Sequence, residues 1–568
     1  MTLRKKDILL GLFCFLLGNL PWSAAQITFH SADLHPPVKH PIKLSGTFGE
    51  LRAHHFHYGL DIKSSNGESG DTIFAISDGF ITRVIVESGR YGKGVWVEHP
   101  GGLTSQYAHL MRFTPLIDSI VLATQEARQA FEIDLNLPDG KFPVKKGDVI
   151  GLMGNTGHSL GPHLHFELWR SDQRIPLNPL LLGFSIEDPT PPIIERVDVH
   201  TLDSLCGVIT TQSWLPSTSG DTVIVNGSQV GLGVLVYDPQ NGGINKNGTY
   251  SISIATADVP EYEIKFDSIP SDVAGSYTGL IDYRNWIQKD EFVHRCYVLP
   301  ALHGCLDPDG KNGIIDLQGG LIKEVTVKAC DFFENCSEFN VFLQSKISQA
   351  ENQSEKTGDL IDWDSSYTFR DDNYFFSWEK RTLYQSAEVP VNLVPDEQAL
   401  GGKSLELGDL HVPLKKPVRL GMKPEVQHGG WMRVTMVERE NGRKPKILGS
   451  IWSEEYLVAS TPSFGTFCLI YDTLPPSINL LERNLTSQTL FQRFVINDNL
   501  EHGSGGRGLR YRATLDGQWI LAEFDLKSDQ LSCAVDLSTL SPGQHAFQLL
   551  ITDFVGNRTI YDYQFNTN

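Results

Sequence analysis

Residues 161–169 read GPHLHFELW, and this stretch gives the clearest fold signal in the chain. Polar and apolar residues alternate along it, which is the period of a β-strand with one buried face. Gly161-Pro162 fixes the backbone where the strand begins. On such a strand the polar residues His163, His165 and Glu167 share one face, and the core face carries Leu164, Phe166 and Leu168.

Similar alternating runs surround this strand from Ile42 to about Phe184. They include TIFAISDGFITRVIV (72–86), GVWVEHPGG (94–102), LTSQYAHL (103–110) and DVIGLMGNTG (148–157). Gly, Asn and Asp separate the runs, a pattern that predicts an antiparallel sheet domain over 26–186 rather than an α/β domain. One helix is expected within it, over Leu116–Phe131, as an excursion between strands.

The length and charge of the chain limit its organisation and partners. A chain of 568 residues is too long for one core, so two to four domains are expected. The net charge of −20 argues against nucleic acid as a partner. Residues 26–184 hold 14 basic and 16 acidic residues, whereas 185–568 hold 31 and 51. The acidity therefore belongs to the C-terminal part, which suggests a different role for it.

The first 25 residues predict a cleavable secretory signal. A basic start precedes an apolar run from Ile8 to Leu17 and a small-residue site at Ala24-Ala25. The apolar run is short for a membrane span, although a retained anchor remains the alternative, and no later segment is apolar for long enough. We therefore expect an exported protein in the periplasm or envelope of a Gram-negative-type bacterium. Its seven remaining cysteines would meet an oxidising compartment; Cys330 and Cys336 could bridge across a turn, and the odd count leaves one thiol over.

A weak internal repeat divides the acidic part. DPTPPII (188–194) matches DTLPPSI (472–478), and VKACDFFENCSEFNVF (327–342) matches LLITDFVGNRTIYDYQF (549–565). Two immunoglobulin-like β-sandwiches are expected, at 187–346 and 472–568. The β-rich segment 347–471 between them is either a third sandwich or an elaboration of its neighbours, and the polar stretch 348–359 is expected to be a linker. The predicted fold class is therefore all-β.

Three places in the first domain bring histidine beside glycine: His57 with Asp61, His109, and the His163/His165 pair. A catalytic zinc takes three His or carboxylate ligands and leaves a position for water. His57, Asp61 and one histidine of the pair supply such a set, and two further histidines could act as general base and oxyanion stabiliser.

Each of these motifs alone has a plainer interpretation. A single HxxxD is usually a polar loop, an HxH is usually a solvent-facing strand pair, and a lone histidine is usually buried and hydrogen-bonded. Their occurrence in order within one domain favours the metal site. Glu167 could orient a ligand from the same face. The other histidines are assigned rim or structural roles: His54 and His55 at the rim, His99 at a hairpin, and His158 bordering the cleft.

These motifs, in this order over about residues 44–182, resemble the LytM/lysostaphin-type zinc metallopeptidases, which cleave peptide bonds in bacterial peptidoglycan. The matching segments are FGELR, HYGLDI, FAISDGFIT, YGKGVWVEHPGG, YAHL, VKKGDVIGLMGNTG, GPHLHFE and NPLL. The resemblance implies Zn²⁺ ligands at His57, Asp61 and His165 and catalytic histidines at His109 and His163. All five positions are filled, unlike in degenerate family members that act as non-catalytic activators.

The resemblance also has departures. An insertion at about 114–141 is similar to one typical of a Bacteroidota-like branch, and it could wall the cleft or contact the next domain. Neither an occluding N-terminal segment nor a LysM or SH3-type wall-binding signature is visible. The acidic sandwiches would then supply targeting, spacing or binding to an envelope partner. The alternatives to a peptidoglycan endopeptidase are a non-catalytic wall-binding or activating adaptor, and a metallopeptidase acting on a protein substrate.

Overall fold

The computed structural model describes residues 34–567 except 54, 173, 216–220, 241–243, 258, 307–310, 318–319, 347–358, 425–432, 441 and 503–507. The expected signal 1–25, His54 and nearly all of the expected linker 348–359 lie outside the described residues. Regular structure is almost entirely antiparallel β, which confirms the predicted fold class. Among the described residues, no helix has the length and apolarity needed to span a bilayer.

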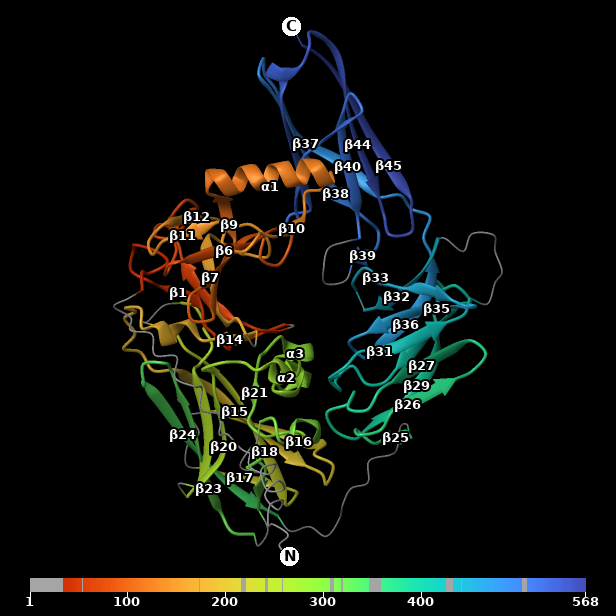
Figure 1. The fold of residues 1–568 in the computed structure, drawn as a ribbon. Coiled ribbons are helices and arrows are strands. Elements are labelled where there is room, and N and C mark those ends of the chain that lie inside the picture. Colours follow the sequence, from red (N-terminus) through yellow and green to blue (C-terminus); the bar gives the residue numbers. More distant parts are fainter. Residues whose placement is uncertain are drawn as a thin grey trace, which may run out of the picture.

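Four β modules follow one another along the chain, here called module 1 (34–186), module 2 (187–346), module 3 (359–471) and module 4 (472–567). They are arranged around a ring, and module 4 returns to lie beside helix α1 of module 1 (Figure 1). The return is direct: Arg512 Nη1 donates to Gln129 Oε1 at 2.9 Å, and Lys527 Nζ donates to the carbonyl of Asn155. The residues of the insertion thus contact the last module of the chain.

Module 1 contains one large and one small sheet. Its hydrophobic core is formed by the apolar residues that alternate with polar ones along the strands, as expected. The large sheet has the order β1 (Leu44–Gly46), β4 (Gly59–Lys63), β13 (His163–Arg170), β8 (Leu103–Ala108), β7 (Lys93–His99), β6 (Gly79–Val86) and β10 (Ile133–Asn136), with β11 (Pro143–Val144) on β6 and β14 (Ile175–Leu177) on β13. The small sheet contains β5 (Thr72–Phe74), β12 (Val149–Met153) and β9 (Leu110–Phe113), and β2 (Leu51–Arg52) pairs with β3 (His55–Phe56).

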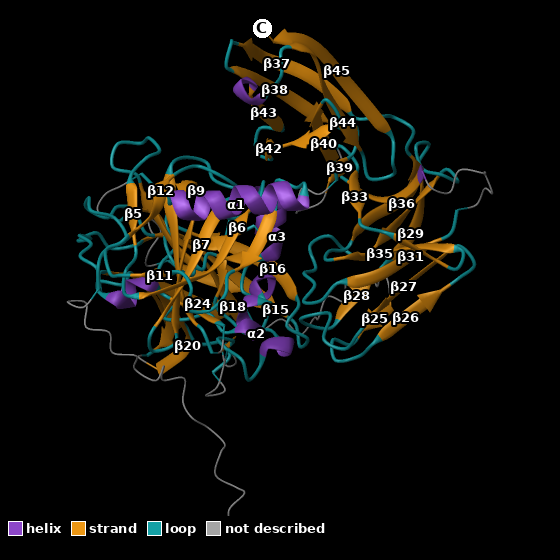
Figure 2. Cartoon of the chain, turned by 45° about the horizontal axis from the view of Figure 1, so that its top comes forward, coloured by secondary structure: helices purple, strands orange, loops and turns teal. Residues whose placement is uncertain are grey.

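The expected helix is present as α1 (Pro115–Arg128), the longest helix in the described chain (Figure 2). Pro115 occupies its first turn, where a missing N–H costs nothing. The helix ends three residues earlier than expected because Gln129 adopts a left-handed φ of 48°. Phe131 lies beyond the helix but is buried in the core of module 1, so its apolar character reflects packing rather than helix periodicity.

Modules 2 and 4 each pair two sheets face to face. The first sheet of module 2 holds β16 (Val208–Trp214), β15 (Ile193–Leu202), β18 (Gln229–Tyr237), β21 (His294–Arg295) and β22 (Ile315–Asp316), and the second holds β17 (Thr222–Val225), β24 (Cys336–Ser345), β23 (Lys323–Cys330), β19 (Ser251–Thr256) and β20 (Val259–Lys265). Module 4 contains β37 (Ser477–Leu485), β38 (Thr489–Asn497), β43 (Gln530–Asp536) and β42 (Ala522–Asp525), opposite β41 (Gln518–Ile520), β40 (Arg510–Leu515), β44 (Gly543–Thr552) and β45 (Arg558–Thr567).

Module 3 also has two main sheets around its own core. The first contains β26 (Tyr367–Arg370), β27 (Tyr374–Trp378), β31 (Val418–Met422), β35 (Tyr456–Thr461) and β34 (Ile451–Ser453). The second contains β29 (Val391–Pro395), β30 (Lys403–Leu407), β36 (Gly465–Tyr471), β32 (Val434–Arg439) and β33 (Lys446–Leu448), and β39 (Glu501–His502) of module 4 pairs with β33. A short pair, β25 (Asp359–Ile361) and β28 (Ala387–Val389), lies apart, and module 2 adds the short helices α2 (Ser271–Ala274) and α3 (Tyr283–Lys289).

Two of the described cysteines form a disulfide and others are buried as free thiols. Cys330 and Cys336 form a disulfide, which confirms the bridge suggested by their spacing around a turn. Cys296, Cys468 and Cys533 are buried in module cores instead. A buried apolar position raises the pKa of the Cys296 thiol and leaves it unreactive.

Candidate metal centre

The pairing of β4 with β13 brings the HxxxD and HxH motifs together. In the register of these antiparallel strands His165 stands directly opposite Asp61. Residues opposite each other in a ladder share a face, so the carboxylate and the imidazole meet. His57 lies two residues before β4 and contacts both of them. Core packing of Leu164, Phe166 and Leu168 fixes which face the histidines occupy, as the alternation predicted.

Three side-chain atoms converge on one point. His57 Nε2 lies 3.0 Å from Asp61 Oδ1 and 3.0 Å from His165 Nδ1, and His165 Nδ1 lies 2.8 Å from Asp61 Oδ1. All three residues are buried, with exposed fractions of 1%, 5% and 6%. An ion at about 2 Å from each atom, the usual length of zinc bonds to nitrogen and oxygen, fits just outside this triangle.

The partners on the far sides of the two rings make these atoms lone-pair donors. His57 Nδ1 donates to the carbonyl of Thr47 at 2.8 Å, and His165 Nε2 donates to Glu167 Oε1 at 2.7 Å. In the neutral imidazole the other nitrogen is then unprotonated. When both rings are neutral, two nitrogen lone pairs and a carboxylate oxygen point at one another, and a bound cation makes this arrangement favourable. The donor set fits zinc.

The electrostatics divide the roles of these groups. Burial lowers the pKa of His57 to about 4, so its ring is neutral and free to bind a metal. Burial alone would raise the pKa of Asp61, but its interactions with the surrounding imidazoles of His57, His163 and His165 hold the pKa well below its usual value. Burial alone would lower the pKa of His165, yet hydrogen bonds to Asp61 and Glu167 raise it to about 9.

His109 and His163 lie side by side next to this triangle. Their ring centroids are 4.7 Å apart, and His163 Nε2 lies 3.4 Å from Asp61 Oδ1. His109 Nδ1 donates to the carbonyl of Thr156 at 2.8 Å, which leaves Nε2 unprotonated. Burial and the two neighbouring histidines keep the pKa of His109 well below its ordinary value, so its ring is neutral. All five residues named from the sequence therefore meet at one place.

The backbone around His109 is arranged for this position. His109 joins β8 to β9 with a φ of 60°, a left-handed conformation that costs energy for a non-glycine residue and is common at functional sites. The carbonyl of Thr156 accepts from His109, and the segment that carries it packs closely against the backbone of Gly92. This close packing requires a glycine at 157, because Gly157 has a φ of 71° and a Cβ there would lie 2.3 Å from the backbone nitrogen of Gly92. A side chain at that position would push Thr156 away from His109.

Sequence reasoning missed several residues that support the centre. Arg52 Nη2 lies 2.5 Å from Asp61 Oδ2 and Arg52 Nε lies 3.2 Å from Glu50 Oε1, so the second oxygen of Asp61 is held by a charged pair. Tyr91 OH donates to Glu167 Oε1, and Trp169 Nε1 donates to Glu167 Oε2. Arg52 and Glu50 lie in the quoted FGELR segment, but the contact of Arg52 with Asp61 depends on the β2–β3 hairpin. Glu167 itself was expected to orient a ligand, and its contact with His165 is present.

The remaining histidines of module 1 lie outside the triangle. His99 ends β7 and is buried, with Nδ1 donating to the carbonyl of Asp78 and Nε2 2.7 Å from Ser105 Oγ. His55 is exposed on β3, and His158 is exposed in the loop after β12. His99 therefore has the structural role expected of it.

Module 2 packs directly behind the centre. The ring of Phe56, next to His57, lies 5.9 Å from the ring of Phe266, and both are buried in a small cluster between the modules. Thr47 Oγ1 donates to the carbonyl of Gly248 at 2.8 Å, while the carbonyl of Thr47 accepts from His57. The position of a candidate ligand thus depends on a sandwich that follows it in the chain.

Comparison with known families identifies two segments. Residues 55–125 and 137–179 match the model of peptidase family M23, and residues 358–472 match that of a Zu5-like domain. The M23 match is interrupted inside the stretch 114–141 treated above as an insertion. It contains all five candidate site residues.

Curated relatives match about a quarter of the chain. A DD-carboxypeptidase/endopeptidase Mpg of Neisseria meningitidis is 30% identical over 158 residues, which is 27% of this chain and 29% of the relative. An uncharacterized metalloprotease of Haemophilus influenzae is 31% identical over 150 residues, 26% of this chain and 24% of the relative. The chain thus spans less than a third of the length of these curated relatives.

Among solved structures, the catalytic domain of lysostaphin from Staphylococcus simulans is 25% identical, covers 25% of this chain and 92% of its own, and has a TM-score of 0.18. The catalytic domain of the M23 protein EnpA from Enterococcus faecalis is 23% identical, covers 23% of this chain and 82% of its own, and has a TM-score of 0.17. The family match confirms the resemblance stated from the sequence: through residues 55–179 the chain carries a peptidase family M23 domain of the LytM type.

Proposed function

We propose that the protein is an exported zinc metalloendopeptidase that hydrolyses peptide bonds in bacterial peptidoglycan. The observation that carries the proposal is the convergence of His57 Nε2, Asp61 Oδ1 and His165 Nδ1, with His109 and His163 beside them. Two imidazoles and one carboxylate are the ligands of a catalytic rather than a closed structural zinc site.

The bound Zn²⁺ would supply a Lewis acid that polarises the amide carbonyl and makes water nucleophilic near neutral pH. The residues of the chain do the rest. His109, neutral and with Nε2 unprotonated, is placed to take a proton from the attacking water and return it to the leaving amine. His163, beside the metal triangle, is placed to stabilise the oxyanion that forms on the carbonyl. Arg52 and Glu167 hold Asp61 and His165 in their ligating orientation.

The substrate assignment is supported by the family and by the relatives, one of which is named as a DD-carboxypeptidase/endopeptidase. Export is supported by the signal-like sequence of residues 1–25. The acidic modules 2 to 4 would position the peptidase domain within the envelope or bind an envelope protein there.

The test is zymography on purified peptidoglycan with mass spectrometry of the released peptides and metal analysis of each protein. Wild type should clear the gel and carry one zinc; His165→Ala should lose both properties, and His109→Ala should lose clearing while keeping the metal. His411→Ala, in module 3, is the matched control and should behave as wild type. Clearing that persists in both site variants would contradict the mechanism.

Two alternatives are separated by the same measurements. A wild-type protein with zinc but no action on peptidoglycan would favour a protein substrate. A wild-type protein that binds peptidoglycan without zinc would favour a non-catalytic adaptor. The filled ligand set is the observation against the adaptor, because a binding module has no need for three converging acceptor atoms.

A further inference from the structure

A second group of buried carboxylates lies where module 1 passes into module 2. Asp188 belongs to the segment that joins the modules, Asp238 directly follows β18, and Asp331 directly follows β23. One oxygen from each lies within 4.8 Å of the other two. Asp238 and Asp331 are 4% and 3% exposed, and Oδ2 of Asp188 is buried although the residue is partly exposed.

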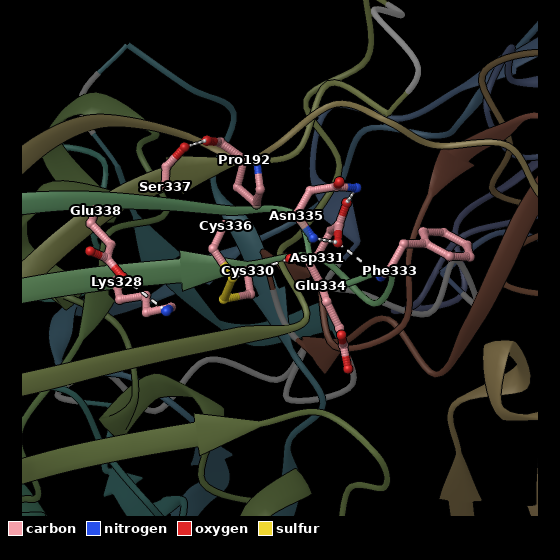
Figure 3. Close-up of a disulfide and its surroundings, with 10 residues drawn as sticks. All are labelled: Pro192, Lys328, Cys330, Asp331, Phe333, Glu334, Asn335, Cys336, Ser337 and Glu338. Carbon is pink, nitrogen blue, oxygen red and sulfur yellow. Dashed lines mark hydrogen bonds and ion pairs between the residues drawn. A yellow bond between two sulfur atoms is a disulfide. The ribbon is translucent and has the colours of Figure 1, made fainter.

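Backbone amides and one asparagine fix these carboxylates. Asp331 Oδ1 accepts from the backbone N–H groups of Phe333 and Asn335, at 2.8 and 2.9 Å (Figure 3). Asn335 Nδ2 donates both to Asp331 Oδ2 and to the backbone carbonyl of Asp188. The Cys330–Cys336 disulfide closes the same turn, with Cys330 directly before Asp331 (Figure 3). The acidic groups are therefore held together by the fold.

Asp238 and Asp331 place two acidic groups in a buried position. Among the described residues, no Lys, Arg or His forms an ion pair with Asp238 or Asp331. Burial and the charges of Asp188 and Asp331 raise the pKa of Asp238 to about 7. Like charges this close in a buried place repel strongly unless a cation lies between them.

The side chain of Asn247 is an independent indication of a ligand. Asn247 and Asp238 form an antiparallel bridge in which each backbone N–H donates to the other's carbonyl, at 3.1 and 2.8 Å. Directly opposed residues of such a pair project their side chains to the same face, so the amide of Asn247 lies alongside the carboxylate of Asp238. Asn247 is 1% exposed, yet neither Oδ1 nor Nδ2 has a hydrogen-bond partner among the described residues. Buried amide groups in proteins normally have a hydrogen-bond partner, so the unpaired side chain of Asn247 indicates a bound ligand.

The arrangement recurs in module 4. Asp472, Asp498 and Asp553 form a second triad within the same 4.8 Å limit, and they occupy the corresponding places before β37, after β38 and after β44. Asn557 Nδ2 donates to Asp553 Oδ2 and to the carbonyl of Asp472, which repeats the contacts of Asn335. This triad also lies where one module joins the next. The sequence repeat found at the outset is thus a repeat of acidic clusters.

We propose that the first triad, with Asn247, is a Ca²⁺ site that braces the junction between modules 1 and 2. Carboxylate and amide oxygens are hard ligands, which favour Ca²⁺ over zinc. Calcium binds oxygen at 2.3–2.6 Å, so the oxygens around one ion are at most about 5 Å apart, and the three carboxylate oxygens lie within that range of one another.

The site connects to the zinc-binding region through the residues around Asp238 and Asn247. Gln240 Oε1 accepts from the backbone N–H of Leu44 in β1, and the carbonyl of Gly248 accepts from Thr47 Oγ1. Thr47 in turn accepts from His57. Calcium bound by Asp238 and Asn247 therefore stabilises the contacts that position His57. The proposed calcium site shares no ligand with the proposed zinc site.

The experiment uses the full exported chain, passed over a chelating resin and reloaded with one equivalent of Zn²⁺. Calcium binding is measured by titration calorimetry, and unfolding by scanning calorimetry with and without about 10 mM Ca²⁺, above the roughly 0.1–1 mM dissociation constants of extracellular calcium modules. An Asp553→Asn background silences the second triad, so that calcium binding there reports the first. On it are compared Asp238→Asn, Asn247→Ala and the control Asp139→Asn, an exposed aspartate of module 1.

We expect the background protein to bind one Ca²⁺ and to unfold several degrees higher when calcium is present. Asp238→Asn should weaken binding at least about tenfold, because it removes ligand charge. It should also raise the unfolding temperature without calcium, since the like-charge repulsion is relieved. Asn247→Ala should weaken binding, and Asp139→Asn should match the background protein.

Two results would overturn the proposal. The first is the absence of any calcium-dependent shift in the background protein; a loss of stability as the pH rises from about 4 to about 7, which calcium does not reverse, would then show that the triad is kept as protonated carboxyls. The second is unchanged calcium affinity in Asp238→Asn. Neither depends on the proposed peptidase activity, because His165→Ala should bind calcium as the background protein does.

Discussion

His165 Nε2 lies 2.7 Å from Glu167 Oε1, two residues further along the same face of β13. This contact fixes the ring so that Nδ1 points toward Asp61 Oδ1. Glu167 is itself buried, at 1% exposure, and accepts from Tyr91 and Trp169 as well. One carboxylate therefore sets both the orientation and the basicity of a proposed zinc ligand.

Glu167→Gln should weaken zinc binding about 10–100-fold, the usual effect of changing a residue that orients a metal ligand. A glutamine has a single acceptor oxygen, so it cannot accept from His165 and Trp169 on opposite sides. The measurement is a zinc competition titration against a chromophoric chelator. Glu98→Gln, an exposed carboxylate on β7 of the same sheet, is the control and should leave the affinity unchanged. Equal affinities for the two variants would show that Glu167 does not tune the centre.

Zinc loading should release protons near pH 8. In the metal-free protein the contacts with Asp61 and Glu167 raise the pKa of His165 to about 9, so the ring carries a proton that must leave when Nδ1 binds the metal. Calorimetric titrations of zinc in buffers of different ionisation enthalpy should give about one proton per zinc at pH 8. No buffer dependence would mean that His165 is already neutral.

The same pKa predicts how the metal-free protein responds to pH. The folded value of about 9 lies above the value of about 6.5 expected for an unfolded histidine, so folding takes up a proton between these limits. This contribution to stability is complete below pH 6.5 and is lost as the pH rises to about 9. Urea unfolding of zinc-free protein should therefore show a decline in stability over this window, and the decline should be absent in His165→Ala.

The sequence predicted the site better than it predicted the supports of the site. Alternation along residues 163–168 fixes the strand and its two faces, and the five candidate residues could be named because each lies in a short motif. The Arg52–Asp61 pair could not be named, because it depends on how the hairpin β2–β3 folds back. The packing of Phe266 behind Phe56 joins residues more than 200 positions apart, and no local pattern encodes such a contact.

The contact between module 4 and module 1 was likewise not predicted from the sequence. The charge count separated the acidic part from the peptidase domain and suggested a different role for it. In the structure Tyr511 and Phe524 pack against the core cluster of module 1, and Lys527 reaches the loop beside Thr156. Half-buried aromatic residues on sandwich strands carry no signal that distinguishes a core-facing from a partner-facing position.

His109→Ala should reduce the rate of peptide-bond hydrolysis about 10²–10⁴-fold, the range typical for loss of a general acid–base group. Its zinc content should equal that of wild type, because Nδ1 contacts the carbonyl of Thr156 and the ring is not in the metal triangle. Turnover of a defined peptidoglycan peptide, followed by chromatography, gives the rate, and atomic absorption gives the metal. A variant that loses zinc together with activity would place His109 among the ligands instead.

Phe524→Ala should loosen the contact between modules 4 and 1. Phe524 packs against the core clusters of both modules. Removing a half-buried phenyl ring costs about 1 kcal/mol of apolar burial, roughly half the value for a fully buried one. Because that ring belongs to both clusters, scanning calorimetry should show module 4 unfolding at a lower temperature and separately from module 1, and small-angle scattering should show a larger radius of gyration. Phe554→Ala, which removes a phenyl ring of the same module that is 40% exposed, should leave both measurements unchanged. If Phe554→Ala separates the transitions equally, the effect is on the stability of module 4 alone. The contact of Phe524 with module 1 is then not what keeps module 4 beside module 1.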